Sequence, residues 1–198
     1  MGMIVVIVVV CQVRLRHFEL VYSMTISNFT ALVTAIGERI DRLNMAIGRA
    51  ASWCALAIVL IGFAVVLMRY VLGLGSIWLQ ESILYAHSAL FLLAAAWTLK
   101  EGGHVRVDVI YADAAPRTKA WIDLLGALLL LLPFCLAILY FSAPYVARSF
   151  AILERSRETS GLPLVFLLKA LIPVFALMLG LQGVAQMVRA AAVLRGSR

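Results

Sequence analysis

The chain has 198 residues, of which 64% are apolar and 14% are charged, and its mean hydropathy is +1.03. Soluble domains are about half apolar and about a quarter charged, so this composition excludes an ordinary water-soluble domain. The net charge of +7 does not indicate a nucleic-acid partner, because most Lys and Arg residues flank apolar runs instead of lining one face. The composition therefore predicts an all-α membrane protein.

Residues 1–33 are predicted to be an N-terminal extension. The apolar run Met3–Cys11 is too short to cross a bilayer, and basic residues follow it instead of preceding it as they do in a signal peptide. One hypothesis is that translation starts at Met24, so that residues 1–23 are a start-site artefact. N-terminal sequencing of the native protein tests this hypothesis.

Residues 34–49 have helical periodicity, with an apolar face and a charged face. The apolar positions are Ile36, Ile40, Leu43 and Ile47, and the charged positions are Glu38, Arg39, Asp41, Arg42 and Arg49. This pattern is typical of an amphipathic helix that lies in the membrane interface before the first span. The alternative is that the apolar stripe packs against the protein's own helix bundle, and periodicity alone does not choose between the two.

Four segments within a predicted membrane domain at 50–198 are long and apolar enough to cross a bilayer, which requires about 20 residues. They lie at about 50–72, 79–99, 121–143 and 162–188. Trp78 and Trp97 are separated by a helical rise of about 28 Å, as expected of aromatic residues at the two interfaces of one span. We therefore predict four transmembrane helices preceded by an interfacial helix.

The distribution of basic residues predicts that both termini are cytoplasmic. The predicted inner side carries Arg14, Arg16, Arg39, Arg42, Arg49, Lys100, Arg106, Arg117, Lys119, Arg189, Arg195 and Arg198, whereas the outer side carries Arg148, Arg155 and Arg157. In this orientation the first outer loop, Gly73–Ile77, is short and uncharged. The second outer loop, Pro144–Gly161, is longer and contains charges of both signs.

Few ionisable residues lie within the predicted spans, where burial is costly unless the group is paired or hydrated. Glu81 and Lys169 are predicted at similar depth, so they either pair with each other, contact a partner chain, or lie at headgroup level. Asp123 is expected at the inner headgroup level. His87 is the one histidine within a span, and a haem held by two histidines would need a second at similar depth.

The remaining features of the spans indicate helix packing more than a substrate path. Gln182, Gln186 and Arg189 share one helix face, beside a pair of small residues at Ala176 and Gly180. Transporters with their own ion sites usually have paired broken helices from two repeats, and no such repeat is found here. Pro133 and Pro173 are therefore expected to kink their helices, and the chain is expected to support a larger partner.

Several short motifs occur in a characteristic order between about Ala35 and Arg195. They are Trp78 and Glu81 at the start of the second span, the stretch Gly103-His104-Val105-Arg106-Val107-Asp108 after it, Ser160-Gly161-Leu162-Pro163, and Lys169, Pro173 and Gln182-Gly183 in the fourth span. In these features the chain resembles the small membrane subunit of tripartite ATP-independent periplasmic (TRAP) transporters, the DctQ-like family. His104 and Asp108 lie one helical turn apart, which fits either a short amphipathic stretch after the second span or a docking surface.

The resemblance implies a non-catalytic scaffold subunit in the bacterial inner membrane. It implies that a large membrane subunit holds the substrate and sodium sites, and that a periplasmic binding protein delivers an organic acid and meets the outer loops. No cofactor or metal is expected in this chain. Interface or structural roles are assigned to Trp78, Glu81, His104, Arg106, Asp108, Lys169 and Gln182. The alternative is a haem- or quinone-associated membrane anchor subunit of an oxidoreductase.

Overall fold

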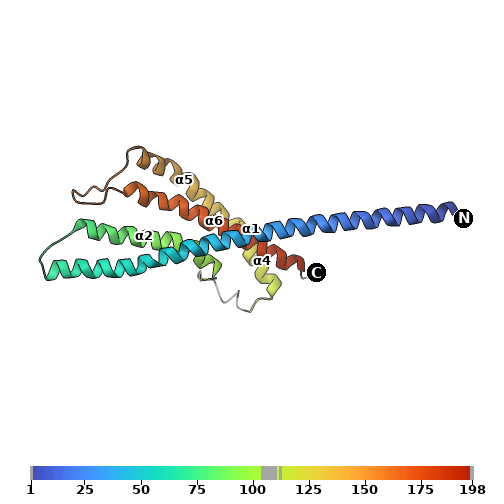
Figure 1. The fold of residues 1–198 in the computed structure, drawn as a ribbon, viewed down its shortest axis with the longest axis horizontal. Helices are drawn as coiled ribbons and strands as arrows, with labels where there is room; N and C mark the ends of the chain where they lie inside the picture. The colour runs from blue at the N-terminus through green and yellow to red at the C-terminus, as the bar shows by residue number, and fades with distance from the viewer. Residues whose placement is uncertain (1, 104–110, 112, 197–198) are drawn as a thin grey trace. The chain divides into compact units, whose positions relative to one another are not determined.

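The computed structural model describes the backbone of residues 2–103, 111 and 113–196, and side chains in these ranges from residue 34 to residue 195. The elements are α1 (Gly2–Tyr70), α2 (Ile77–Lys100), α4 (Pro116–Gly126), η1 (Ala127–Leu131), α5 (Leu132–Ala151) and α6 (Val165–Gly196) (Figure 1). Four helical segments in the described part of the chain are long and apolar enough to cross a membrane: Thr34–Tyr70, Ile77–Lys100, Pro116–Ala151 and Val165–Arg195. The predicted all-α fold with four such helices is confirmed.

The chain divides into two compact units, residues 1–36 and residues 37–198. The first unit is the beginning of α1, and the second contains the remainder of α1 and all other helices. Helix α1 continues without a break through the predicted boundary between residues 49 and 50. The amphipathic segment at 34–49 is therefore continuous with the first spanning helix. Its interfacial position and the start at Met24 stay predictions.

Helix α6 is the central helix of the second unit. It packs against α2, α4, η1 and α5, and Figure 1 shows α5 and α6 side by side. Its buried positions include Ala176 and Ala185, whose small side chains allow neighbouring helices to approach closely. At Gly183, a Cβ atom would lie 2.6 Å from Cδ2 of Leu131, so a larger side chain here requires the Leu131 side chain to shift.

The third spanning segment is made of α4, η1 and α5 in direct succession. Pro116 occupies the start of α4, where the missing N–H of proline costs no helical hydrogen bond. The π-helical turn η1 ends just before Pro133, which cannot donate to a carbonyl of the preceding turn. The sequence predicted a kink at Pro133, and the helix has a wider π-helical turn, η1, immediately before this proline.

The loop between α5 and α6, which was predicted to be the second outer loop, is shorter than expected. Helix α5 passes through Pro144 and ends at Ala151, so the prediction that the loop begins at Pro144 is wrong. A proline removes one backbone hydrogen bond but does not stop a helix that packing stabilises, and Ser149 beyond it is buried. The loop proper comprises residues 152–164.

Candidate functional site

A chain of side-chain hydrogen bonds joins α1 to α6. The amide of Asn44 donates to Gln182 Oε1 at 2.7 Å, the amide of Gln182 donates to Asp41 Oδ1 at 2.8 Å, and Arg189 Nη1 donates to Asp41 Oδ2 at 2.7 Å. Gln182 is 0% exposed and Asn44 is 1% exposed. We call these four residues the Gln182 network. The two buried amides bond to each other, so they hold α1 against α6.

The face of α1 that packs on the bundle is formed by small and polar residues. Its members, spaced three and four residues apart, are Gly37, Asp41, Asn44, Gly48 and Ala51. A Cβ atom at Gly48 would lie 2.7 Å from Cβ of Trp97, so the absence of a side chain lets α1 approach α2.

This arrangement corrects two sequence interpretations. Leu43 is 52% exposed, so the alternative that the apolar stripe packs on the protein's own bundle is wrong at this position. Asp41, which periodicity placed on the charged face opposite the apolar stripe, contacts α6. The cause is that close packing between membrane helices selects small and hydrogen-bonding residues, because lipid is as apolar as leucine.

A second cluster ties the loop at 152–164 to the helix ends. Glu81, in the second turn of α2, accepts hydrogen bonds from the Ser156 hydroxyl and from the backbone N–H of Leu162, the latter at 2.6 Å. Ser156 N–H in turn donates to the Leu162 carbonyl at 3.2 Å, which closes the loop on itself. A Cβ atom at Gly161 would collide with Ser156 and lie 2.8 Å from Glu81 Oε1. This Glu81 cluster therefore needs glycine at position 161.

Lys169 fastens the other side of the same loop. Its Nζ lies 2.5 Å from Glu154 Oε2 and 4.1 Å from the centre of the Tyr145 ring. Glu81 and Lys169, which the sequence offered as a possible pair, are not bonded to each other, because each residue binds a different part of the loop. Glu154, in the loop, occupies the ion-pair position beside Lys169, while Glu81 on α2 is bonded to Ser156 and Leu162. The hydrogen bond from Lys169 also lowers the pKa of Glu154 below its ordinary value.

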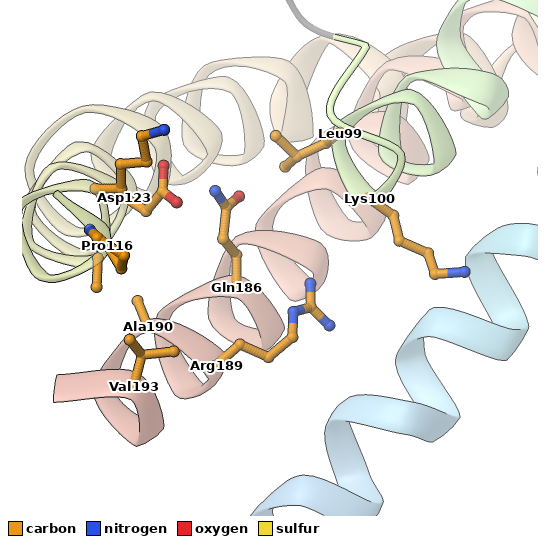
Figure 2. Close-up of a pocket in the computed structure, with 10 residues that line it drawn as sticks. Leu99, Lys100, Pro116, Asp123, Gln186, Arg189, Ala190 and Val193 are labelled. Carbon is orange, nitrogen blue, oxygen red and sulfur yellow. The ribbon is translucent and has the colours of Figure 1, made fainter. Parts of the chain in front are cut away.

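A cavity of about 380 Å³ lies where α2 ends, α4 begins and α6 nears its C-terminus (Figure 2). Lys100, Lys119 and Arg189 contribute positive charge to its lining, and Asp123 contributes negative charge. Asp123 accepts a hydrogen bond from the Tyr111 hydroxyl at 3.0 Å. Asp123 is thus part of a polar cavity wall.

The structure gathers only some of the residues singled out in the sequence. Trp78 lies in the first turn of α2 and is 53% exposed, whereas Gln182, at the other end of the bundle, is buried. His104, Arg106 and Asp108 lie outside the described residues. Sequence reasoning did not assign a site role to Asn44 or Ser156. Asn44 carried a signal, because it is an amide at helical spacing from Gly37 and Gly48, whereas Ser156 lies in a loop without periodicity.

The described residues give no support to a metal or haem site. Among them, no group of three or more His, Cys, Asp or Glu side chains is placed to hold a metal ion. His87 lies on the exposed side of α2.

Comparison with known proteins identifies a family. A family model for tripartite ATP-independent periplasmic transporters, DctQ component, matches residues 58–193. No curated protein and no solved structure matches the chain significantly. The family match confirms the resemblance noted in the sequence, and it does not support the alternative of an oxidoreductase anchor subunit.

Proposed function

Because the chain belongs to the DctQ family of TRAP transporter components, we propose that it is the scaffold subunit of a sodium-driven importer of organic acids. In this proposal it lies in the bacterial inner membrane with both termini cytoplasmic. A large membrane subunit carries the substrate and the ion, and a periplasmic binding protein delivers the substrate. The chain itself performs no chemical reaction.

The observation that carries the scaffold role is the Gln182 network. The amides of Asn44 and Gln182 bind each other, and Asp41 is bonded to both Gln182 and Arg189. Buried amides that are bonded across two helices hold those helices together. Their arrangement supports a rigid brace between α1 and α6.

The outward face of α2 is the surface that we assign to the large membrane subunit. Its exposed positions, spaced four, three and four residues apart, are Gln80, Leu84, His87 and Phe91. His87 is about 15 Å along the helix from Ile77 and about 20 Å from Lys100, so in the proposed arrangement, with α2 crossing the bilayer, it lies near mid-membrane. An ionisable side chain at that depth normally faces protein or a hydrated cavity. A protein partner would supply that cover.

The loop at 152–164 is the surface that we assign to the periplasmic binding protein. Glu81 and Lys169 hold it at two separate points, through Leu162 and Glu154. A loop fixed in this way loses little conformational entropy on binding. It would thus offer the binding protein a preformed docking surface.

Photocrosslinking tests the assembly. A photoreactive amino acid at His87 is expected to crosslink to a co-expressed large subunit in membranes, whereas the same group at Tyr140, on the exposed side of α5, serves as the positional comparison. Absence of a crosslink from position 87, in membranes where the two subunits co-purify, would contradict the assigned face. Failure of the two subunits to co-purify would contradict the assembly itself.

A further inference from the structure

Leu153 has a backbone conformation that leucine rarely adopts. Its φ angle is 45°, in the left-handed region, and the other positive φ angles among the residues that the structure describes belong to Gly73 and Gly102. This region brings the Cβ atom of an L-amino acid too close to a backbone carbonyl oxygen, which glycine avoids because it has no Cβ. Leucine at this position therefore lowers the stability of the fold relative to glycine.

The way in which α5 ends imposes this conformation. The N–H of Leu153 donates to the carbonyl of Phe150 at 3.2 Å. The N–H of Glu154 donates to the carbonyl of Ser149 at 3.0 Å. These two bonds form a Schellman motif, in which the residue at the position of Leu153 is left-handed and is most often glycine. Glu154 is also paired with Lys169 at 2.5 Å, so the turn is held from both sides.

Packing within the chain does not offset the strain at Leu153. Its side chain is 59% exposed and that of its neighbour Ile152 is 72% exposed, so most of this apolar surface is uncovered. A glycine would form the same turn without strain and without the exposed side chain. Strained residues are found mainly where function requires them. The leucine thus indicates a contact outside this chain.

The surroundings of Leu153 favour a protein over the bilayer as the contacting surface. Four ionisable residues follow it within five positions: Glu154, Arg155, Arg157 and Glu158. The last three are exposed and carry charges of both signs. An apolar centre with a charged rim is typical of protein–protein interfaces, whereas the hydrocarbon of a bilayer would exclude such a rim.

We propose that Ile152 and Leu153 form an apolar anchor that inserts into the periplasmic binding protein. This inference rests on the proposed function, which assigns the loop at 152–164 to that partner, and it identifies the residues that dominate the docking energy. The Schellman motif and the ion pair of Lys169 fix the anchor before docking, so little conformational entropy is lost. Leu153 therefore lowers the stability of the fold and raises its affinity for the partner.

The test measures docking of the cognate binding protein to the membrane complex. The full-length chain and its large subunit are reconstituted in nanodiscs, and the purified binding protein, loaded with its substrate, is titrated by microscale thermophoresis. Leu153→Gly and Leu153→Ala should each weaken docking about ten-fold, because the buried surface of a leucine side chain is lost. Leu136→Ala removes a similarly exposed leucine near the start of α5 and should leave docking unchanged.

Thermal unfolding of the same variants separates backbone strain from side-chain contact. Leu153→Gly should unfold about 2–4 °C above Leu153→Ala, because both lose the side chain and only alanine keeps the strained Cβ. Leu153→Met keeps an apolar side chain and should dock like the wild type. Equal unfolding temperatures of the glycine and alanine variants would overturn the inference, as would wild-type docking by both.

Failure of the proposed function gives a different result. If the wild-type complex does not dock the binding protein, the proposed function is wrong, whereas normal docking that survives both truncations of Leu153 contradicts the anchor alone. Contact with lipid is tested with Leu153→Cys. A membrane-impermeant maleimide should label this variant more than the unsubstituted chain, and the binding protein should protect it. Absence of additional labelling would place the anchor in the bilayer and overturn the proposal.

Discussion

Gln182 has the most consequential single side chain in the described structure. It is fully buried, accepts a hydrogen bond from Asn44 and donates one to Asp41. Removing the amide takes the acceptor from Asn44 and one of two donors from Asp41, which keeps its bond to Arg189, and hydrogen bonds between membrane helices are worth about 0.6–1.7 kcal/mol.

Gln182→Leu is therefore expected to destabilise the purified protein by about 1–2 kcal/mol, because both helix contacts lose a partner. Thermal unfolding in nanodiscs measures the change. Gln186→Leu makes the same chemical change one turn further along α6, at a partly exposed position, and should have a much smaller effect. Equal destabilisation by the two variants would show that the network does not brace the bundle.

Lys169 and Glu154 are expected to be energetically coupled. In a double-mutant cycle, Lys169→Met and Glu154→Gln should each release the loop, and the double variant should cost less than the sum of the two. Lys169→Met and Glu81→Gln should be closer to additive, since their partners in the loop differ. Protease accessibility of residues 152–164 provides the readout. Strong coupling of Lys169 with Glu81 and none with Glu154 would contradict the assigned pairs.

Acid should release the same loop. The pKa of Glu154 is lowered in the folded protein, chiefly by the hydrogen bond from Lys169. A carboxyl group with a lowered pKa stabilises the folded state above its ordinary pKa of about 4.3, and this stabilisation disappears as the pH falls through the lowered value. Proteolysis of the loop by an acid-active protease should therefore increase below about pH 4, and Glu154→Gln should remove most of this dependence. An unchanged acid response in Glu154→Gln would exclude Glu154 as its source.

Helix α1 packs on the bundle through small and polar residues, which a search for apolar residues does not detect. Its packed face contains Gly37, Asn44 and Gly48, while the apolar residue Leu43 remains exposed. Exposed apolar side chains are suitable for lipid or a protein partner, whereas small residues permit close helix contact.

Gly48→Ala is expected to push α1 away from α2, because the new Cβ would lie 2.7 Å from Cβ of Trp97. Overpacking of this kind costs about 1–3 kcal/mol. Gly62→Ala is the matched control in the same helix, because its Cβ would make an ordinary contact with Ile83 at 4.0 Å. Thermal unfolding should separate the two variants clearly. A Gly48→Ala protein as stable as Gly62→Ala would contradict the close approach.

The number and approximate extent of the spanning helices could be predicted from the sequence because membrane thickness sets a minimum apolar length. The partners of Glu81 and Lys169 could not be predicted. These partners, Leu162 and Glu154, lie in a loop whose sequence has no periodicity. Asp41 was misplaced for a related reason: a charged residue on a helix is assigned to solvent unless its ion-pair partner, here Arg189, is known.

The described helices of the second unit combine a braced interior with extensive exposed apolar surface. The Gln182 network fixes one end of the bundle and the Glu81 cluster fixes the loop at the other end. Between them, exposed Leu84 and Phe91 flank the exposed His87 near the middle of α2. A braced helix bundle with an exposed histidine on one of its apolar helices fits a subunit that supports a larger protein.

Reconstitution tests this scaffold role most directly. Proteoliposomes are prepared with this chain, with its large membrane subunit, or with both, and uptake of a labelled organic acid that the cognate binding protein delivers is measured with and without a sodium gradient. Uptake is expected only when both membrane subunits, the binding protein and the gradient are present. Uptake by this chain without the large subunit, or full uptake when this chain is omitted, would contradict its role as a required scaffold.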